Sequence, residues 1–533
     1  MAIIDKESGG SFPQRKRRTF SMKNTMKRLL GGLLLGSMMV GLGAGCSKDS
    51  GQSGGGGGVT HDKDTIIVAT MGETPSVSPY AHNASAGYNV NLLNYTSLLR
   101  LDNDLNPQPD LAESFTNIDP TCWEFKLRQD VKFHDGSTME AEDVKASIEY
   151  GKTFPDGSLY NDCIESVEVV DEYTVRIHTS TPNASLLFNL TQHANAIVPK
   201  ELIDAGNDFN ENPIGCGPYK FVDWKRGDQL EFTAFEDYYL GAPKIKNVIW
   251  KIIPEGSSRT IALEAGEVDL LMEVESMDVD RIKENPDLAV LEYTPANMNW
   301  IMLNNEVSGL DNQDFRHALN CAIDKESVVT VALNGLGVVG ETQVPPNLPG
   351  TSTENVDSYD VKKAKEYVEK SGVDPASIDF PIICSDDTKK RAAEVVQANL
   401  AEIGVTANIE SMDLATYMST VAEGNYVAAI GGYTMADTIT YLNGVYHSKS
   451  INAANKSRLN DPEIDALIDQ ATATADAAER EAITSEICAK LNTICTQVPL
   501  YQPLNLRAYN ANLENVEIDG AGDVRIENFS WKE

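Results

Sequence analysis

Residues 109–149 read PDLAESFTNIDPTCWEFKLRQDVKFHDGSTMEAEDVKASIE, and the second half of this stretch carries a helix signal. Ser137, followed by Glu140, is a capping box at a helix N-terminus. The apolar residues that come next recur at helical spacing: Ala141, Val144 and Ile148. The stretch therefore predicts a helix with one apolar face.

Strand and helix patterns alternate on both sides of this helix. Strand patterns occur at residues 64–70, at 168–179 as a hairpin, and at 247–254. A helix with Asp360 as N-cap ends before Gly372, and residues 380–411 read as strand, helix and strand. This alternation predicts α/β domains. About 475 residues follow the first 58, a length that divides into two or three domains.

The N-terminal segment, residues 1–45, has the layout of a secretory signal. Residues 15–28 are rich in Lys and Arg, residues 29–42 are apolar, and residues 43–45 are small. The apolar run is shorter than a membrane-spanning helix. An uncleaved membrane anchor remains an alternative, and Met22 is an alternative start of the chain.

Cys46 directly follows these small residues, and "GAGC" at 43–46 resembles the lipobox of bacterial lipoproteins. The resemblance implies that Cys46 receives a lipid and becomes the mature N-terminus. Residues 46–63 are rich in Gly and Ser and form a flexible linker. A soluble signal with an incidental Cys46 is the other interpretation.

The composition limits the classes of partner. The net charge is −35, and residues 1–45 carry eight basic against two acidic residues, so the rest of the chain carries −41. Nucleic-acid binding needs a basic surface, so we expect no nucleic-acid partner. The acidic excess favours solubility and does not choose a ligand.

Seven cysteines follow Cys46, and an odd number cannot all pair. Cys488 and Cys495 are two helical turns apart, which is too far for a disulfide within a helix. We expect most of the seven to be small buried side chains.

Three motif matches are better explained as ordinary structure. GLGVVG at 335–340 follows a helical pattern and precedes a loop, whereas a dinucleotide site needs a strand before the motif and a helix after it. Four residues have calcium-loop spacing: Asp102, Asp104, Asn106 and Glu113. Pro107 stands where that loop needs Gly, so we interpret the segment as a strand-ending turn. His134–Asp135 has no paired histidine motif and is interpreted as a turn before the helix. No GxSxG occurs, and we expect no enzyme, no metal and no cofactor.

The opening stretch, residues 109–149, resembles the signature of family 5 of the bacterial extracellular solute-binding proteins, the peptide and nickel family that serves ABC importers. Further blocks follow in the family's order: 213–254, 262–270, 314–329, 358–372 and 478–503. The resemblance extends over about residues 64–520.

The resemblance implies a two-lobed α/β fold of the periplasmic-binding-protein type, with two crossing strands as a hinge. The implied lobe I core consists of residues 64–94, 215–295 and 500–533, with an extra subdomain at 95–214. Lobe II is expected at 296–499. The family captures a solute by hinge closure and delivers it to a permease driven by a partner ATPase. We therefore expect a monomer that is lipid-anchored on the extracytoplasmic face of the cell membrane. A Gram-positive cell surface is favoured over a periplasm as its location.

The resemblance also supplies candidate ligand-binding residues. Peptide binders of the family hold the ligand's amino terminus with an aspartate after a Gly-Trp block; here Asp437 is that candidate, and Tyr433 takes the place of Trp. Asn83, Ala84 and Ser85 fall where a family loop gives backbone contacts. Trp300 and Tyr441 are candidates to line the cleft, with ordinary core packing as the alternative for each.

We therefore expect a binding protein for di- or oligopeptides. Another solute, such as an oligosaccharide or a metal chelate, remains an alternative, although no histidine pattern for nickel occurs. A peptide-sensing receptor and a surface hydrolase are further alternatives.

Overall fold

The structure, a computed structural model, describes residues 64–82 and 85–532. These residues belong to one compact unit, residues 59–533. The expected signal segment, the linker, Cys46, Asn83 and Ala84 lie outside the described residues, as does the side chain of Ser85. In the part of the chain that the structure describes, no helix combines the length and apolar character needed to cross a membrane.

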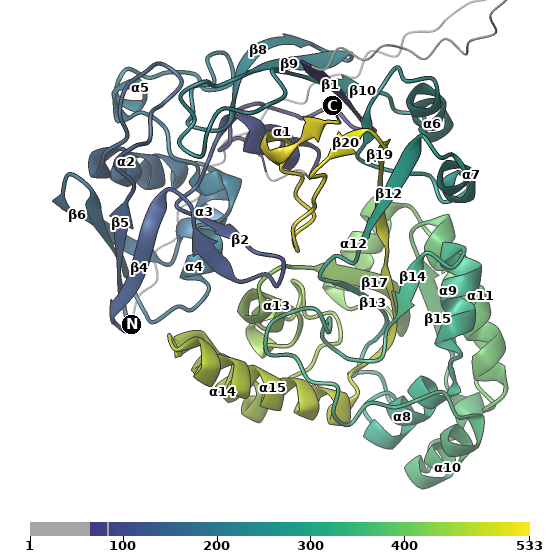
Figure 1. The fold of residues 1–533 in the computed structure, drawn as a ribbon. Helices are drawn as coiled ribbons and strands as arrows, with labels where there is room; N and C mark the ends of the chain where they lie inside the picture. Colours follow the sequence, from purple (N-terminus) through teal and green to yellow (C-terminus); the bar gives the residue numbers. More distant parts are fainter. Residues whose placement is uncertain (1–63, 83–84, 533) are drawn as a thin grey trace, which may run out of the picture. The chain divides into compact units, whose positions relative to one another are not determined.

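The first large sheet has seven strands in the order β12-β19-β11-β1-β10-β9-β8, and we call the part built on it lobe I (Figure 1). Its strands are β1 (Thr65–Thr70), β8 (Tyr219–Lys225), β9 (Gln229–Ala234), β10 (Asn247–Ile252), β11 (Leu270–Leu271), β12 (Leu288–Tyr293) and β19 (Asn505–Asn510). β1 is parallel to β10 and β11, and the other neighbours are antiparallel. The helices of lobe I are α1 (Ser85–Asn94), α6 (Gly256–Glu264) and α7 (Val279–Glu284).

The second large sheet has six strands in the order β14-β18-β13-β17-β15-β16, and we call the part built on it lobe II. Its strands are β13 (Asn297–Leu303), β14 (Gly337–Val339), β15 (Phe380–Cys384), β16 (Ala407–Ser411), β17 (Ala428–Thr434) and β18 (Gln497–Pro503). Its helices are α8 (Gln313–Ala322), α9 (Lys325–Leu333), α10 (Val361–Ser371), α11 (Asp387–Ala401), α12 (Leu414–Glu423), α13 (Thr438–Val445), α14 (Pro462–Ala473) and α15 (Ala477–Ile494).

Lobe II confirms the local predictions closely. The predicted strand–helix–strand unit is β15, α11 and β16, with the two strands parallel. The Asp360 side chain caps α10 by accepting from the Lys363 N–H, and Gly372 ends that helix with φ of 68°. Only glycine adopts this left-handed conformation without cost.

A four-stranded sheet in the order β4-β5-β7-β6 forms the core of a subdomain, which we call the four-stranded subdomain. Its strands are β4 (Ala112–Asp119), β5 (Cys122–Leu127), β6 (Ile164–Asp171) and β7 (Thr174–Thr179); its helices are α2 (Ala141–Gly151), α3 (Pro155–Asn161), α4 (Leu186–Asn189) and α5 (Lys200–Asp204). Two small pairs complete the fold: β2 (Leu99–Leu101) with β3 (Pro107–Pro109), and β20 (Leu513–Glu514) with β21 (Ser530–Trp531). Val144 and Ile148 of α2 are buried in the same core as Phe125 of β5, as the apolar face predicts.

The capping box of α2 lies three residues later than predicted. The helix begins at Ala141, and the Asp143 carboxylate accepts from the Glu140 N–H at 2.8 Å. Ser137 instead donates from its hydroxyl to Asp135 at 2.6 Å. Ser137 therefore belongs to the turn before the helix, because the nearer Asp135 side chain takes its hydroxyl.

The chain crosses between the two large sheets twice, at residues 294–296 and at Leu504. The flanking strands pair in both sheets, Tyr293 with Asn505 and Asn299 with Tyr501, so the crossings lie side by side. This arrangement confirms the expected two-lobed fold with a two-stranded hinge. The expected boundary between residues 499 and 500 falls inside β18, which continues to Pro503 in the lobe II sheet.

The motif matches are ordinary structure, as interpreted from the sequence. Residues 335–340 follow the helix α9 and contain the strand β14, whereas a dinucleotide site has a strand before the motif and a helix after it. The Asp102 carboxylate closes the turn between β2 and β3 by accepting from the N–H groups of Asp104 and Asn106, both at 2.9 Å. His134 is buried beside Gly217, whose carbonyl accepts from it at 3.0 Å, and burial lowers the pKa of His134 to about 4.

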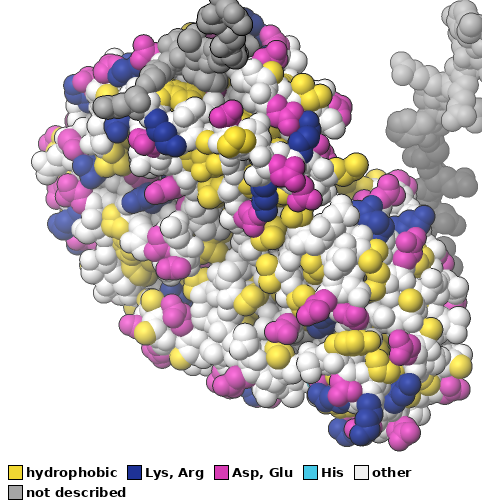
Figure 2. Space-filling view, turned by 45° about the vertical axis from the view of Figure 1, so that its right-hand side comes forward, with side chains coloured by type: hydrophobic (Ala, Val, Ile, Leu, Met, Phe, Trp, Pro, Cys, Tyr) yellow, Lys and Arg dark blue, Asp and Glu magenta, His cyan; other side chains and the backbone are white. Residues whose placement is uncertain are grey.

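The cysteines that follow the linker are all unpaired, and six of the seven are buried. Burial raises the pKa of the Cys321, Cys488 and Cys495 thiols to about 12. They therefore behave as small packed side chains. On the face shown in Figure 2, acidic and basic side chains are interspersed, without a continuous basic surface.

Candidate functional site

A cavity of about 960 Å³ lies between lobe I and lobe II. Its lining from lobe I includes Thr70–Gly72, Trp250, Tyr293, Arg507 and residues 272–276. Its lining from lobe II includes Asn297, Leu333, Thr388, Arg391 and residues 434–436. The crossing residues Pro295 and Leu504 also border it. A movement at the crossings therefore changes the width of the cavity.

The strands of lobe I explain why this end of the sheet forms a site. β1 and β11 are parallel neighbours, and the residues that follow both strands line the cavity. Carboxyl ends of parallel strands are where α/β sheets present loops to a ligand. Thr70 and Met71 lie at this edge, beside the residues that follow β11.

Two glutamates after β11 line the lobe I side. Glu273 accepts from the Thr70 hydroxyl at 3.1 Å and from the Met71 N–H at 2.9 Å. Glu275 lies 3.6 Å from the buried guanidinium of Arg259. Both carboxylates are therefore held in place by partners inside lobe I.

Arg391 lines the opposite wall from the first turns of α11, which follows β15. Its Nη2 donates to the Ala332 carbonyl at 2.9 Å and to the Thr388 hydroxyl at 3.1 Å. Among the described residues, no carboxylate lies within ion-pair distance of it. A guanidinium held by neutral acceptors keeps its charge available to a ligand carboxylate.

Arg507 of β19 is a second cation that lines the cavity, on the lobe I wall, and its side chain is 8% exposed. Its guanidinium donates to the Met272 carbonyl and to the Tyr293 hydroxyl, the latter at 3.2 Å. Its Nε has no partner among the described residues. Because Tyr293 ends β12 at the first crossing, Arg507 ties the cavity wall to the hinge.

Asp523 adds a third carboxyl group on the lobe I side, and Leu101, Phe188 and Trp250 add apolar surface. Burial and the neighbouring Asp519 together raise the pKa of Asp523 to about 8. The cavity thus offers carboxyl groups on the lobe I wall and, on the lobe II wall, a guanidinium that has no carboxylate partner among the described residues. Such a pair of walls suits a ligand that carries both charges.

The comparison with known proteins agrees with this geometry. The family described as bacterial extracellular solute-binding proteins, family 5 Middle, matches residues 106–453. The chain belongs to this family. The resemblance drawn from the opening stretch is thereby confirmed.

Individual relatives support the family 5 assignment over most of the chain. Heme-binding protein A of Haemophilus influenzae is 30% identical over 70% of this chain and 75% of that protein. The glutathione-binding protein GsiB of Pectobacterium atrosepticum is 28% identical over 80% of this chain and 86% of its own. The solved structure of HbpA2 from Haemophilus parasuis superposes with a TM-score of 0.81 at 25% identity, covering 88% of this chain and all of that one.

Asp437, the expected family 5 amine anchor, lies at the N-cap of α13. Its Oδ2 accepts from the Thr440 N–H, the Thr440 hydroxyl and the Ser185 hydroxyl, each at 2.7 Å. It is half-buried and is not part of the cavity lining, whereas its neighbours Thr434, Met435 and Ala436 are. The structure thus places the Asp437 carboxylate beside the cavity, with its Oδ2 already accepting hydrogen bonds from Thr440 and Ser185.

The expected aromatic residues lie behind the cavity wall. Trp300 is 1% exposed on β13 and donates from its ring nitrogen to the Gln343 carbonyl at 3.3 Å. Tyr441 is fully buried, and Tyr433 packs edge-on against it at 5.5 Å between ring centroids. All three belong to one hydrophobic core and none lines the cavity. Ala86, which follows the expected contact loop at residues 83–85, does line it.

Sequence reasoning missed the charged residues of the wall. A signal existed for Arg391, because it lies in the first turns of a helix that follows a predicted parallel strand, where ligands bind in α/β sheets. Arg507 and Asp523 carry no comparable local pattern. Their neighbours Tyr293 and Tyr88 come from distant parts of the chain.

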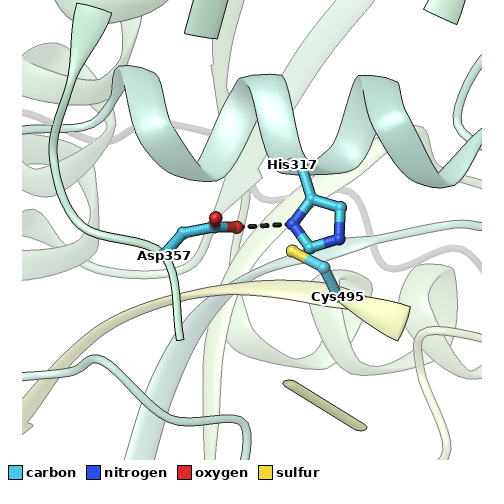
Figure 3. A group of neighbouring side chains, drawn as sticks. All are labelled: His317, Asp357 and Cys495. Carbon is cyan, nitrogen blue, oxygen red and sulfur yellow. Dashed lines mark hydrogen bonds and ion pairs between the residues drawn. The ribbon is translucent and has the colours of Figure 1, made fainter. Parts of the chain in front are cut away.

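One buried group of three side chains, outside the cavity, has the chemistry of a metal site: His317, Asp357 and Cys495 (Figure 3). His317 Nδ1 lies 2.5 Å from Asp357 Oδ2, and its Nε2 lies 2.9 Å from the Thr493 carbonyl. The Lys363 ammonium group donates to the other Asp357 oxygen, Oδ1, at 3.0 Å. Both ring nitrogens and both carboxylate oxygens are thus engaged by protein groups, and we interpret the group as a hydrogen-bonded link between α8, α10 and the end of α15.

Proposed function

We propose that this chain is the lipid-anchored binding protein of an ABC importer, and that it captures short peptides in the cavity between its lobes. Family 5 supplies the solute-binding function, and the two crossings beside the cavity supply a hinge for capture. Partner permease and ATPase subunits would receive the peptide and drive its transport.

The observation that carries the peptide proposal is the charge arrangement of the cavity. A peptide has a carboxylate at one end and an ammonium at the other, and the cavity offers Arg391 on one wall and three carboxyl groups on the opposite wall. Charge-assisted hydrogen bonds of this kind are stronger than neutral ones. One relative is named for binding glutathione, which is itself a peptide. Another relative is named for binding heme, so a different solute is the competing outcome.

Native mass spectrometry of the protein purified from a peptide-rich medium tests this proposal. We expect a ladder of bound masses that matches short peptides. A single bound mass that is not a peptide would overturn the peptide proposal and identify the ligand class. A second spectrum after incubation separates binding from hydrolysis, because a binding protein leaves the peptide masses unchanged.

The lipid anchor is supported by the sequence around Cys46, which lies outside the described residues. Replacing Cys46 with Ser should release the protein from the membrane fraction into the medium. Ser47→Ala is the matched control, since it changes the next residue and keeps the thiol. Equal membrane retention of both variants would contradict the anchor.

A further inference from the structure

Asp523 is held at the cavity wall by a preorganised loop. The Asp519 carboxylate accepts from the N–H groups of Ala521 and Asp523, at 3.0 and 2.9 Å, which fixes the turn. The Asp523 side chain is 5% exposed and borders the main cavity. It also borders a smaller cavity of about 20 Å³ behind the wall, room for about one water.

His193 borders both of these cavities beside Asp523. Its Nε2 lies 2.9 Å from the His82 carbonyl, which can only accept, so Nε2 carries the hydrogen and Nδ1 is an acceptor. Nδ1 is buried without a partner among the described residues. Burial lowers the pKa of His193 to about 4, which keeps the ring neutral at physiological pH. A buried acceptor without a donor is costly, and a ligand N–H would satisfy it.

Asp523 belongs to a buried group of carboxyl and guanidinium side chains. Arg525 is the buried cation of this region, and it is shared with four carboxyl groups: Asp110, Asp519, Asp523 and Glu527. Burial raises the pKa of each of these carboxyl groups. Arg507 faces Asp523 from β19, and the Tyr88 hydroxyl bonds to it from α1. Arg100 and Arg128 also act on Asp110. The charge count alone therefore does not call for a further cation, and a ligand site here depends on the two cavity-lining side chains, Asp523 and His193.

We propose that Asp523 and His193 form a subsite of lobe I that binds the protonated amine of the ligand. The ammonium group donates one hydrogen to the Asp523 carboxylate and another to His193 Nδ1, and the proton held by Asp523 leaves to solvent. The subsite rests on the proposed peptide function and differs from the expected anchor, since Asp437 is already bonded to Ser185 and Thr440. The ligand then spans the cavity, with its amine on lobe I and its carboxylate at Arg391 of lobe II.

The test compares two probe mixtures in native mass spectrometry: random tri- to pentapeptides with free amino termini, and the same peptides N-acetylated. We expect the wild-type protein to retain the free-amine mixture at least about tenfold better, because acetylation removes the charge. Asp523→Asn should abolish that preference, and His193→Ala should reduce it several-fold. Glu517→Gln is the matched control, since Glu517 is an exposed carboxylate near Asp523 in the sequence that does not line the cavity, and it should keep the preference. Glu273→Gln tests the other carboxylate of the same wall, which already accepts from Thr70 and Met71.

The outcomes separate the two proposals. Equal retention of both mixtures by the wild-type protein would overturn the amine subsite and leave peptide capture standing. Retention of neither mixture would overturn peptide capture and the subsite together. Loss of the preference in Glu273→Gln but not in Asp523→Asn would move the amine to Glu273 and overturn the assignment. Thermal unfolding confirms that each variant is folded, and His193→Ala gives an independent reading if Asp523→Asn is unstable.

Discussion

The Ser185 hydroxyl donates a hydrogen bond of 2.7 Å to Asp437 Oδ2, and this bond joins the four-stranded subdomain to the first turn of α13 in lobe II. A backbone bond from the Ala184 N–H to the Thr472 carbonyl, at 2.8 Å, lies beside it. The same oxygen of Asp437 thus caps α13 and links the four-stranded subdomain to lobe II.

Replacing Asp437 with Asn distinguishes these tasks from amine anchoring. Asparagine caps a helix as well as aspartate does, so we expect peptide affinity to stay within about twofold of wild type. If the carboxylate itself holds the ligand's ammonium, the same change would lower affinity by about tenfold or more. Titration calorimetry with a retained peptide measures the difference. Asp437→Ala, which loses the cap, should in addition cost about 1 kcal/mol of stability.

Replacing Arg391 with Ala should weaken peptide binding by roughly 10- to 100-fold, since a hydrogen bond to a charged partner is worth about 1.5–3 kcal/mol. Lys390→Ala is the matched control, because Lys390 is an exposed cation one residue earlier on the same helix. Calorimetry should show no change for this control. Equal losses in both variants would mean that general charge, and not the wall position, governs binding.

The stability of the protein should depend on pH through Asp523. Its pKa of about 8 lies far above the ordinary aspartate value of about 3.9, so the native state keeps a proton that the unfolded chain has lost. This contribution to stability is complete below about pH 4 and is lost as pH rises through about 8. Asp523→Asn cannot titrate, so it should gain stability relative to wild type across this window.

Thermal unfolding between pH 4.5 and 8.5 measures this gain. Asp379→Asn is the comparison variant, since Asp379 is exposed before β15 and lies outside the buried group around Asp523. A stability difference between Asp523→Asn and wild type that stays the same at every pH would contradict the raised pKa of Asp523.

The link between His317 and Asp357 should be structural and independent of metal. His317→Ala removes both ring hydrogen bonds in a buried site and should lower the free energy of unfolding by about 3 kcal/mol. His178→Ala, at a partly exposed position of β7, should change it by about 0.5 kcal/mol or less. Adding zinc should leave the melting temperature of the wild-type protein unchanged. A rise in melting temperature with zinc would show that the group binds the metal.

The elements of the fold were predictable where local chemistry decides them. Asp360 and Gly372 mark both ends of α10, and the apolar pattern of residues 380–411 marks β15, α11 and β16. The start of α2 was misplaced because Ser137 with Glu140 fits the capping-box pattern, whereas the box that forms is Glu140 with Asp143, which does not. The Asp135 side chain accepts from the Ser137 hydroxyl and keeps Ser137 in the turn before the helix.

The site was less predictable, because burial and not residue type decides which side chains reach the cavity. Trp300 lies in β13, whose residues are buried on both faces of the sheet, so its sequence gives no sign of which side it faces. Burial and the neighbouring Asp519 raise the pKa of Asp523, and the groups that face it include Tyr88 of α1 and Arg507 of β19, which come from other segments of the chain. The pattern of a single segment cannot report such a neighbourhood.

The position of β19 in the lobe I sheet determines when that sheet can be completed during folding. This strand comes from residues 505–510, yet it lies between β12 and β11 inside the lobe I sheet. A chain that ends before residue 505 leaves β12 without a neighbour and takes Arg507 from the cavity wall. Lobe I can therefore complete its sheet only after nearly the whole chain has been synthesised, and chains that end before β19 should fail to form a complete lobe I.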